Sequence, residues 1–270
     1  MKGLKEYRDR VAVVTGASSG IGAELARELA RRGMRVALVA RRRDRLERLA
    51  DEIQTAGGQA AVHVCDVSSR SAVEKACADV VAAWGCLDLL VNNAGYGRHV
   101  LLKDHDVEDI ERITQVNYLG TVYWIKAALP HMRARGSGWI VNVSSFAGVT
   151  PQPDEAAYAA SKWAVTGLSE SIAPELEPLG IHVLVVHPVL VRTEMFTPEI
   201  MARLPASSEG TFVEAPEFVR DLLRALERGK TSVVIPGRYA VAPILSTLFP
   251  RLIGGGMSRI KLRGLPDLTS

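Results

Sequence analysis

The sequence predicts an α/β protein, a single doubly wound Rossmann-type domain with a mostly parallel seven-stranded sheet and helices on both faces. Short apolar runs suited to buried parallel strands alternate with segments of helical periodicity along the chain. The first run passes directly into a glycine-rich turn and then a helix. No repeat or linker divides the 270 residues, 47% of which are hydrophobic, so one sizeable core is expected. We therefore expect one domain over residues 1–270, with residues 194–212 as a substrate lid and residues 237–270 as a C-terminal extension.

Composition narrows the class of protein. A net charge of +3 is only mildly basic, so we expect no nucleic acid partner. The three cysteines form no C-x-x-C pair, which indicates reduced thiols and a cytoplasmic protein. The six histidines have no zinc spacing, so we expect no metal. The N-terminus lacks an apolar signal core, and no run approaches the ~18 apolar residues that a membrane span needs.

The first strand, Val11–Val14, leads into the turn Thr15–Gly22, and a helix follows over residues 23–32. Glycines let the backbone approach a pyrophosphate, and a helix N-terminus offers free N–H groups and partial positive charge. The spacing is G-x-x-x-G-x-G rather than the commoner G-x-G-x-x-G. A tight structural turn would explain the glycines alone, but the flanking strand and helix favour nucleotide binding.

The second strand, Val36–Ala40, ends at a run of arginines. An NAD-binding unit usually has Asp or Glu here, which binds the ribose hydroxyls. Arg41, Arg42 and Arg43 instead suit a 2′-phosphate, by charge and by forked hydrogen bonds. We therefore expect NADP(H) as the preferred cofactor, with NAD(H) as the alternative. The same arginines also fit the solvated start of a charged helix, whereas the alternating acids disfavour a nucleic acid patch.

The third and fourth strands, Ala60–Cys65 and Leu87–Val91, end in further small or polar residues. Asp66 either accepts a hydrogen bond from an adenine amino group or caps the helix predicted over Ser71–Trp84. Asn92-Asn93-Ala94-Gly95 follows the fourth strand, at the edge where open parallel sheets bind their ligands.

Asn117 lies within a helix predicted from about Val107 to Met132, and it matters only if it faces the site. The fifth strand, Trp139–Val143, is closed at the same carboxyl edge by Ser144-Ser145. One glycine and two prolines predict a loop over residues 146–155.

The helix predicted over Ala156–Glu177 contains Tyr158-Ala159-Ala160-Ser161-Lys162. Tyr158 and Lys162 are four residues apart, so their side chains share one helical face. A nearby ammonium favours phenolate and lowers the pKa of a tyrosine, which can then exchange a proton near neutral pH. Without support from elsewhere in the chain, the pair would be an ordinary aromatic residue and lysine on a helix.

The sixth strand, Ile181–Val186, is expected to stop at His187-Pro188, and an apolar, irregular segment follows over Thr193–Leu204. A helix over Pro216–Arg228 and a last strand over Ser232–Ile235 complete the alternation. These spacings fit right-handed βαβ units.

Together these motifs resemble the short-chain dehydrogenase/reductase family over residues 10–193. The matching residues are TGASSGIG, NNAG, the strand-end Ser145, YAASK and the segment from Pro188 to Thr193. Ser145 lies thirteen residues before Tyr158, which is the spacing that the family uses. Each motif is weak alone, but five in this order are specific.

The resemblance implies NAD(P)-linked interconversion of a carbonyl and a secondary alcohol. Tyr158 is then the general acid/base, and Lys162 lowers its pKa and binds the nicotinamide ribose. Ser145 hydrogen-bonds the substrate oxygen, and Asn117 anchors a water that relays protons. The implied cofactor residues are Gly16, Ser18, Ser19, Gly20, Ile21 and Gly22 at the pyrophosphate, Arg41 and Arg42 at the 2′-phosphate, Asp66 and Val67 at adenine, Asn93 with Ala94 and Gly95 at the adenosine ribose, and Thr193 with Pro188 at the carboxamide.

Two features depart from the family pattern. Val189 follows Pro188 where the family usually has glycine, and a side chain there could change how the nicotinamide is seated. No basic residue stands at Ser18 or Ser19, where some NADP-preferring members have one, so Arg41 and Arg42 must supply that charge.

The substrate pocket is expected between residues 96–100, 146–154 and 195–212. Its apolar members favour a hydrophobic carbonyl or alcohol substrate, although a lid that buries them against itself would explain them equally. These members are Phe146, Val149, Met195, Phe196, Met201 and Phe212. His99 and Asp154 are candidate polar contacts.

Residues 239–253 form an apolar stretch of about 15 residues that Pro243 and Pro250 interrupt. We expect it to cap the pocket or pack in an oligomer, a homodimer or homotetramer, in preference to lying on a membrane surface. A non-catalytic NADP(H)-sensing regulator on the same fold is the alternative function. The complete set of Asn117, Ser145, Tyr158 and Lys162 argues against it, because a sensor has no need of them.

Overall fold

The computed structural model of the protein describes residues 3–203 and 210–249. Its main sheet has seven strands in the order β3-β2-β1-β4-β5-β6-β9, and every neighbouring pair is parallel. The strands are β1 Val11–Thr15, β2 Arg35–Ala40, β3 Gln59–Val64, β4 Leu89–Asn92, β5 Gly138–Val143, β6 Ile181–Pro188 and β9 Ser232–Ile235, with β7 Val191–Arg192 and β8 Val213–Glu214 forming a separate parallel pair. The predicted fold class is confirmed, and this sheet is wholly parallel.

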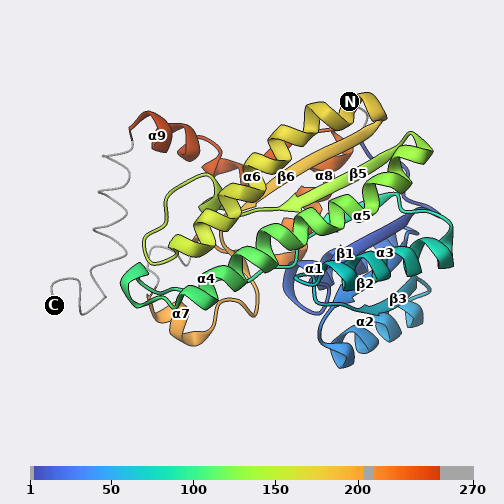
Figure 1. Ribbon diagram of the computed structural model, residues 1–270, viewed down its shortest axis with the longest axis horizontal. Coiled ribbons are helices and arrows are strands. Elements are labelled where there is room, and N and C mark those ends of the chain that lie inside the picture. The colour runs from blue at the N-terminus through green and yellow to red at the C-terminus, as the bar shows by residue number, and fades with distance from the viewer. Residues whose placement is uncertain (1–2, 204–209, 250–270) are drawn as a thin grey trace.

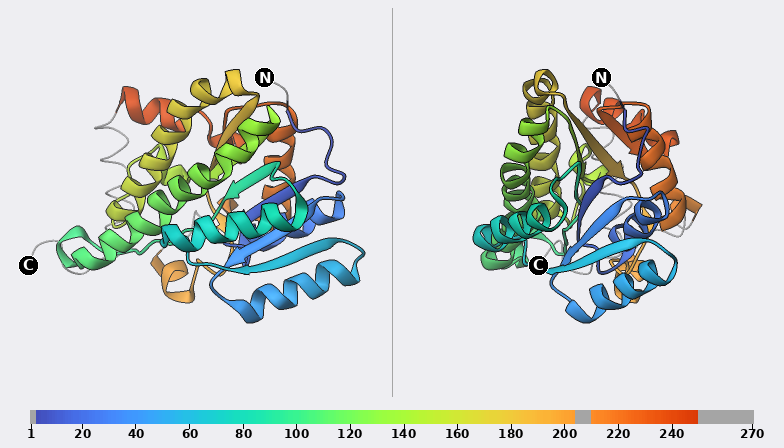
Figure 2. Two further views of the ribbon diagram at one scale, coloured as in Figure 1. Left: turned by 45° about the vertical axis from the view of Figure 1, so that its right-hand side comes forward. Right: turned by 90° about the vertical axis from the view of Figure 1, so that its right-hand side faces the viewer.

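Helices cover both faces of the sheet, which Figure 2 shows edge-on between two helical layers. One layer contains α3, α5 and α6, and the other contains α1, α2 and α8 (Figure 1). The helices are α1 Gly20–Arg31, α2 Arg43–Thr55, α3 Arg70–Trp84, α4 Val107–Thr114, α5 Gly120–Arg135, α6 Ala156–Leu176, α7 Pro198–Arg203, α8 Ala215–Glu227 and α9 Ala242–Leu248. The central strands therefore have few polar side chains, because both of their faces are buried.

The carboxyl ends of β1 and β4 lie side by side where the strand order reverses. Thr15 ties these ends together, since its hydroxyl oxygen accepts the N–H of Asn93 at 2.9 Å and that of Ala94 at 3.0 Å. Its own proton goes to the carbonyl of Val91, 3.2 Å away. The glycine turn after β1 and the Asn-Asn-Ala-Gly segment after β4 thus meet at the crevice where such sheets bind ligands.

One predicted boundary was wrong. β6 continues through His187 and Pro188, because β9 extends the pairing and aligns Pro188 with Ile235. The chain around Asn117 is helical as predicted, and a π-helical turn over Gln115–Leu119 joins α4 to α5. Residues 204–209 of the predicted lid, and the predicted C-terminal extension beyond residue 249, lie outside the described residues.

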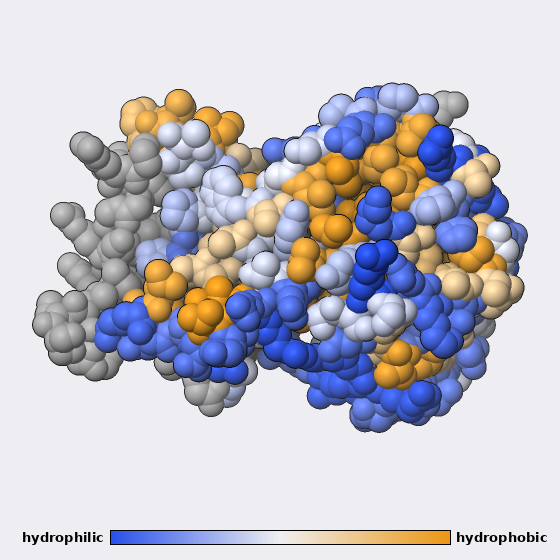
Figure 3. All heavy atoms as spheres, viewed as in Figure 1, coloured by the Kyte–Doolittle hydropathy of each residue, from blue (hydrophilic) through white to orange (hydrophobic). Residues whose placement is uncertain are grey.

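The described part of the 239–253 stretch forms a short turn and α9, with apolar side chains on the surface (Figure 3). The exposed residues there are Val241, Ile244, Leu245, Leu248 and Phe249. Tyr239 makes an edge contact with Phe146, at 6.4 Å between ring centroids. Within residues 3–203 and 210–249, no helix has the length and apolar character that crossing a membrane requires.

The carboxylate of Asp88, almost fully buried, ties the start of the sheet to the end of α5. It accepts the N–H of Val11 at 2.8 Å and lies 3.3 Å from a guanidinium nitrogen of Arg10 and 3.4 Å from one of Arg135. Asp88→Ala leaves a buried N–H without an acceptor, so we expect the free energy of unfolding to fall by about 2–4 kcal/mol. Urea denaturation measures this loss, and Asp88→Asn, which keeps an acceptor, should lose less. If the Asp88→Ala protein were as stable as the wild type, the contacts of the Asp88 carboxylate would not contribute to stability.

Candidate active site

Two adjoining cavities open at the carboxyl edge of the sheet. One is lined by the glycine turn, by Arg41 and Arg42, and by Asp66 and Val67. The other is lined by the ends of β5 and β6 and by α6. Both cavities share Ile21, Asn93, Gly95, Thr193 and Met195, so they form one continuous site.

The glycine turn is packed too closely for side chains at key positions. A Cβ on Gly22 would lie 2.4 Å from the carbonyl oxygen of Gly16. Asn93, expected at the adenosine ribose, lines both cavities, and its Nδ2 donates to the carbonyl of Thr15 at 2.9 Å and so fixes the turn. Ser19, the residue before α1, makes no side-chain cap, and the helix N-terminus faces the cavity that the turn lines. This backbone arrangement fits a pyrophosphate.

Arg42 lies against the turn itself. Its guanidinium donates to Ser18 Oγ at 2.8 Å and to Ser19 Oγ at 2.7 Å. It therefore brings a positive charge to the two positions where the sequence has no basic side chain. Arg41 lines the same cavity, close enough to Asp66 to favour its ionised form. The two arginines fit a 2′-phosphate by charge and geometry.

Asp66 borders the cofactor cavity and also organises its own loop. Its Oδ1 accepts from the N–H of Ser68 at 3.0 Å and from the hydroxyl of Ser68 at 2.7 Å. Burial opposes ionisation, but these bonds together with Arg41 and Arg112 hold the pKa of Asp66 below its usual value. The cap of α3 is Ser69, which accepts from the N–H of Ala72, so the alternative role of Asp66 as the helix cap does not hold.

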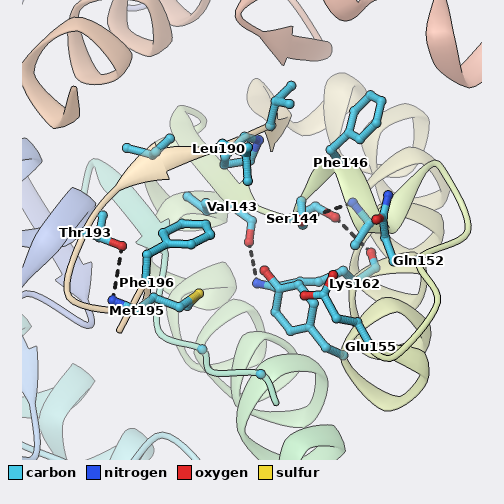
Figure 4. A pocket seen from close by; sticks show the side chains of 18 of the residues that line it. Val143, Ser144, Phe146, Gln152, Glu155, Lys162, Leu190, Thr193, Met195 and Phe196 are labelled. Carbon is cyan, nitrogen blue, oxygen red and sulfur yellow. Dashed lines mark hydrogen bonds between the residues drawn. The ribbon is translucent and has the colours of Figure 1, made fainter. Parts of the chain in front are cut away.

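Tyr158 and Lys162 share one face of α6, as their spacing predicts, and both border the second cavity. Figure 4 shows Lys162 at this cavity. Lys162 Nζ donates to the carbonyl of Val143 at the end of β5, 2.9 Å away. It also lies 5.7 Å from the ring centroid of Tyr158. A Cβ on Gly95 would lie 3.3 Å from Lys162 Nζ, so the segment after β4 closes over the ammonium.

The predicted direction of the Tyr158 pKa shift was wrong. Burial raises the pKa of Tyr158 to about 12, outweighing a hydrogen bond with Ser145 that favours the phenolate, and the charge of Glu155 adds to the rise. Burial also lowers the pKa of Lys162 to about 8. Removal from water disfavours the charged form of each group, and here this effect exceeds the attraction between ammonium and phenolate.

The two strand-end serines have different surroundings. Ser144 is structural, since its hydroxyl lies 2.9 Å from both the carbonyl of Lys162 and Thr166 Oγ1. Ser145 borders the pocket, where Oγ accepts from the N–H of Ala147 at 3.1 Å and bonds with Tyr158. Ser145 and Tyr158 therefore lie next to each other at the second cavity.

The ring of His187 hydrogen-bonds to the backbone of Ser145. Sequence reasoning did not identify His187 as part of the site. Its Nδ1 lies 3.3 Å from the carbonyl oxygen of Ser145, which can only accept, so Nδ1 carries the proton. Nε2 then accepts from Ser232 Oγ at 3.3 Å. Burial lowers the pKa of His187 to about 4, so the ring stays neutral at physiological pH.

Asn117, in the π-helical turn, is fully buried behind the segment after β4 and lines neither of the two cavities. Its side chain bonds with the backbone of Tyr96 in both directions, at 3.0 and 2.9 Å, and donates to Ser161 Oγ at 2.9 Å. The amide therefore fastens the segment after β4 to α6. A water anchored by Asn117, as the resemblance implies, would have to use an atom that these bonds leave available.

The second cavity is largely apolar. Met195 and Phe196 line it opposite Gln152 and Glu155 (Figure 4), and Val189 contributes the side chain that replaces the usual glycine. Of the predicted apolar members, Phe146, Met195 and Phe196 line the cavity. Phe212 instead packs edge-on against Phe196, at 5.0 Å between centroids, so the lid also covers itself.

Polar groups gather on one side of this cavity. His99 Nδ1 lies 3.2 Å from Asp154 Oδ2, and His99 Nε2 lies 3.5 Å from Glu155 Oε1. His99 and Glu155 line the cavity, whereas Asp154 stands behind His99. The predicted polar contact of His99 is thus at the pocket, and Glu155 is a member that sequence reasoning did not identify.

Fold and site together define an α/β protein of the dinucleotide-binding type with Ser145, Tyr158 and Lys162 gathered at one cavity. The family model described as short chain dehydrogenase matches residues 10–203, and the chain belongs to this family, the short-chain dehydrogenases/reductases.

Several relatives are similar over most of the chain. An Arabidopsis thaliana protein named 11-beta-hydroxysteroid dehydrogenase-like 4A is 35% identical over 259 residues, covering 94% of this chain and 86% of that protein. A fatty acyl-CoA reductase of Acinetobacter baylyi is 34% identical over 254 residues, covering 90% of this chain and 84% of that enzyme.

Two solved structures of oxidoreductases are also similar to this chain in fold and sequence. A metagenomic short-chain oxidoreductase in complex with NADP has a TM-score of 0.73 and 34% identity, covering 86% of this chain and 98% of that one. A dehydrogenase/reductase from Sinorhizobium meliloti 1021 has a TM-score of 0.77 and 32% identity, covering 85% and 94%.

The lowered pKa of Lys162 makes stability depend on pH. The folded protein releases this proton near pH 8 and the unfolded chain near 10.5, so Lys162 contributes rising stability to the wild type across that window. Lys162→Met lacks this contribution. We therefore expect its unfolding free energy relative to wild type to fall by about 3 kcal/mol between pH 8 and 10.5.

Urea unfolding at several pH values measures the difference, in which groups common to both proteins cancel. Lys75→Met, which removes an exposed lysine of α3, is the matched control and should show no such trend. If the difference in unfolding free energy between Lys162→Met and wild type were the same at every pH in this range, the lowered pKa of Lys162 would be refuted.

Proposed function

We propose that this chain is an NADP(H)-dependent oxidoreductase that interconverts a carbonyl and a secondary alcohol on an apolar substrate, with Tyr158 as general acid/base. The observation that carries the proposal is the position of Tyr158. It lines the apolar cavity, next to Ser145 and Lys162, and that cavity adjoins the one that fits a dinucleotide.

The nicotinamide, when bound, supplies or accepts the hydride. In reduction, negative charge develops on the substrate oxygen, and the hydroxyls of Ser145 and Tyr158 are the donors that would stabilise it. Tyr158 then delivers the proton. Its raised pKa keeps the phenol protonated at neutral pH, which suits reduction. Lys162 would bind the nicotinamide ribose with the donor capacity that Val143 does not use.

Preference for NADP(H) is supported by Arg41 and Arg42 and by the NADP bound to the metagenomic oxidoreductase. An apolar substrate is supported by the cavity wall of Phe146, Met195 and Phe196. It is supported also by the names of the two relatives, which refer to hydroxysteroids and fatty acyl chains.

Tyr158→Phe removes the proton donor and keeps the ring. We expect turnover of carbonyl substrates to fall by about 10²-fold or more, with NADPH affinity nearly unchanged. Steady-state NADPH oxidation and fluorescence titration measure the two quantities. Tyr7→Phe is the control, since it removes a hydroxyl bonded to Glu227 outside both cavities. Substantial turnover in the Tyr158→Phe protein would overturn the proton-transfer role.

Arg41→Ala should weaken NADPH binding by about tenfold or more and leave NADH binding little changed, because only NADPH carries the 2′-phosphate. Titration of both cofactors tests this. Arg43→Ala is the matched control from the same run of arginines, since Arg43 pairs with Glu47 along α2. Equal losses for NADPH and NADH would count against a 2′-phosphate contact.

A further inference from the structure

Arg42, which lines the cofactor cavity, and Arg45 on α2 both contact a carboxylate of the protein. Glu194 follows directly after Thr193, and its Oε1 and Oε2 lie 2.7 and 2.5 Å from Arg45 Nη1. Glu194 Oε2 also lies 3.4 Å from Arg42 Nη1. A carboxylate between two guanidinium groups offers the same charge-assisted hydrogen bonds that a phosphate group accepts.

Glu194 is also in the right place to meet a cofactor phosphate. It lines the cofactor cavity together with Arg41, Arg42 and the turn serines. The other basic residues at the start of α2 pair along that helix, Arg43 with Glu47 and Arg48 with Asp44. Arg42 and Arg45 instead form ion pairs with Glu194, which belongs to the segment after β6.

We propose that Glu194 is a specificity-determining residue for the cofactor, an internal competitor whose carboxylate occupies the arginine site of a 2′-phosphate until NADP(H) displaces it. This inference rests on the proposed function. Displacement would free the start of the lid, because Glu194 joins α2 to the segment that carries Thr193 and Met195. Binding of the 2′-phosphate and movement of the lid would then be coupled.

The strength of the contact is compatible with displacement. All three side chains are substantially exposed, Glu194 at 59%, Arg42 at 42% and Arg45 at 36%. Exposed ion pairs contribute roughly 0–1 kcal/mol each. A phosphate with up to two negative charges can replace such a monoanion. Arg42 itself stays in place through its bonds to Ser18 and Ser19.

The test compares NADPH and NADH dissociation constants for wild type and Glu194→Gln, by cofactor fluorescence titration at low salt and without substrate. We expect NADPH to bind about three- to tenfold more tightly to the variant, because the competitor is gone. NADH should change less than twofold, which also reports a folded cofactor site. The gain for NADPH should shrink in high salt.

Two controls isolate the 2′-phosphate. Glu47→Gln makes the same charge change at an exposed carboxylate of α2, paired with Arg43, and should leave both constants unchanged. The probes 2′,5′-ADP and 5′-AMP should reproduce the difference without a nicotinamide, with only 2′,5′-ADP gaining affinity in Glu194→Gln.

Unchanged or weaker NADPH binding in Glu194→Gln would overturn the inference, the weaker case meaning that Glu194 organises the arginines for phosphate. Equal gains for NADPH and NADH would also overturn it, because the repulsion would then act on the shared pyrophosphate. Failure of the proposed cofactor is distinguishable, since the wild type would then bind NADH but not NADPH. In that case, NADPH binding that appears in the variant would still support the competitor role, and its absence would overturn it.

Discussion

The rest of the site depends on the burial of the Lys162 ammonium group. Lys162 is placed among the ends of β4 and β5, where removing a charge from water is costly. Its described hydrogen bond to Val143 ties α6 to the carboxyl end of β5, and Gly95 leaves room for it. The same dry surroundings hold the proton on Tyr158. The structure thus favours a neutral phenol at Tyr158 and lowers the pKa of the Lys162 ammonium.

The fold could be predicted because its signals are local. Buried parallel strands need continuous apolar runs, and the run Val11–Val14 followed by a glycine turn shows both the strand and its ligand-binding end. The proximity of Tyr158 and Lys162 was also predictable, since residues four apart share one face of a helix. The π-helical turn at Asn117 was not, because its amide is held by Tyr96 and Ser161, 21 and 44 residues away.

The pKa shifts and ion pairs of the site were harder to predict than the positions of its residues. Spacing brings Tyr158 and Lys162 together, but burial sets the sign of the pKa shift, and burial depends on the β4 and β5 ends that close over them. The arginine run likewise predicts positive charge without saying which guanidinium meets the glycine turn. Arg42 does so because Ser18 and Ser19, more than twenty residues earlier, present hydroxyls to it. Glu194 is farther still, 149 residues after Arg45.

The segment after β6 connects these parts of the site within seven residues. At its start, the N–H of Val189 bonds to Ile235 and the carbonyl of Leu190 accepts from Val213, so this end is fixed to the sheet and to β8. Thr193 then lies against the glycine turn, where a Cβ on Gly20 would approach its Cγ2 at 3.0 Å. Beyond it, Glu194 attaches the segment to α2 through exposed ion pairs, which are the weakest of these contacts. Met195 and Phe196, which follow Glu194, line the apolar cavity. If a 2′-phosphate displaces Glu194 as we propose, the release of this weak contact would therefore act on the wall of the apolar cavity.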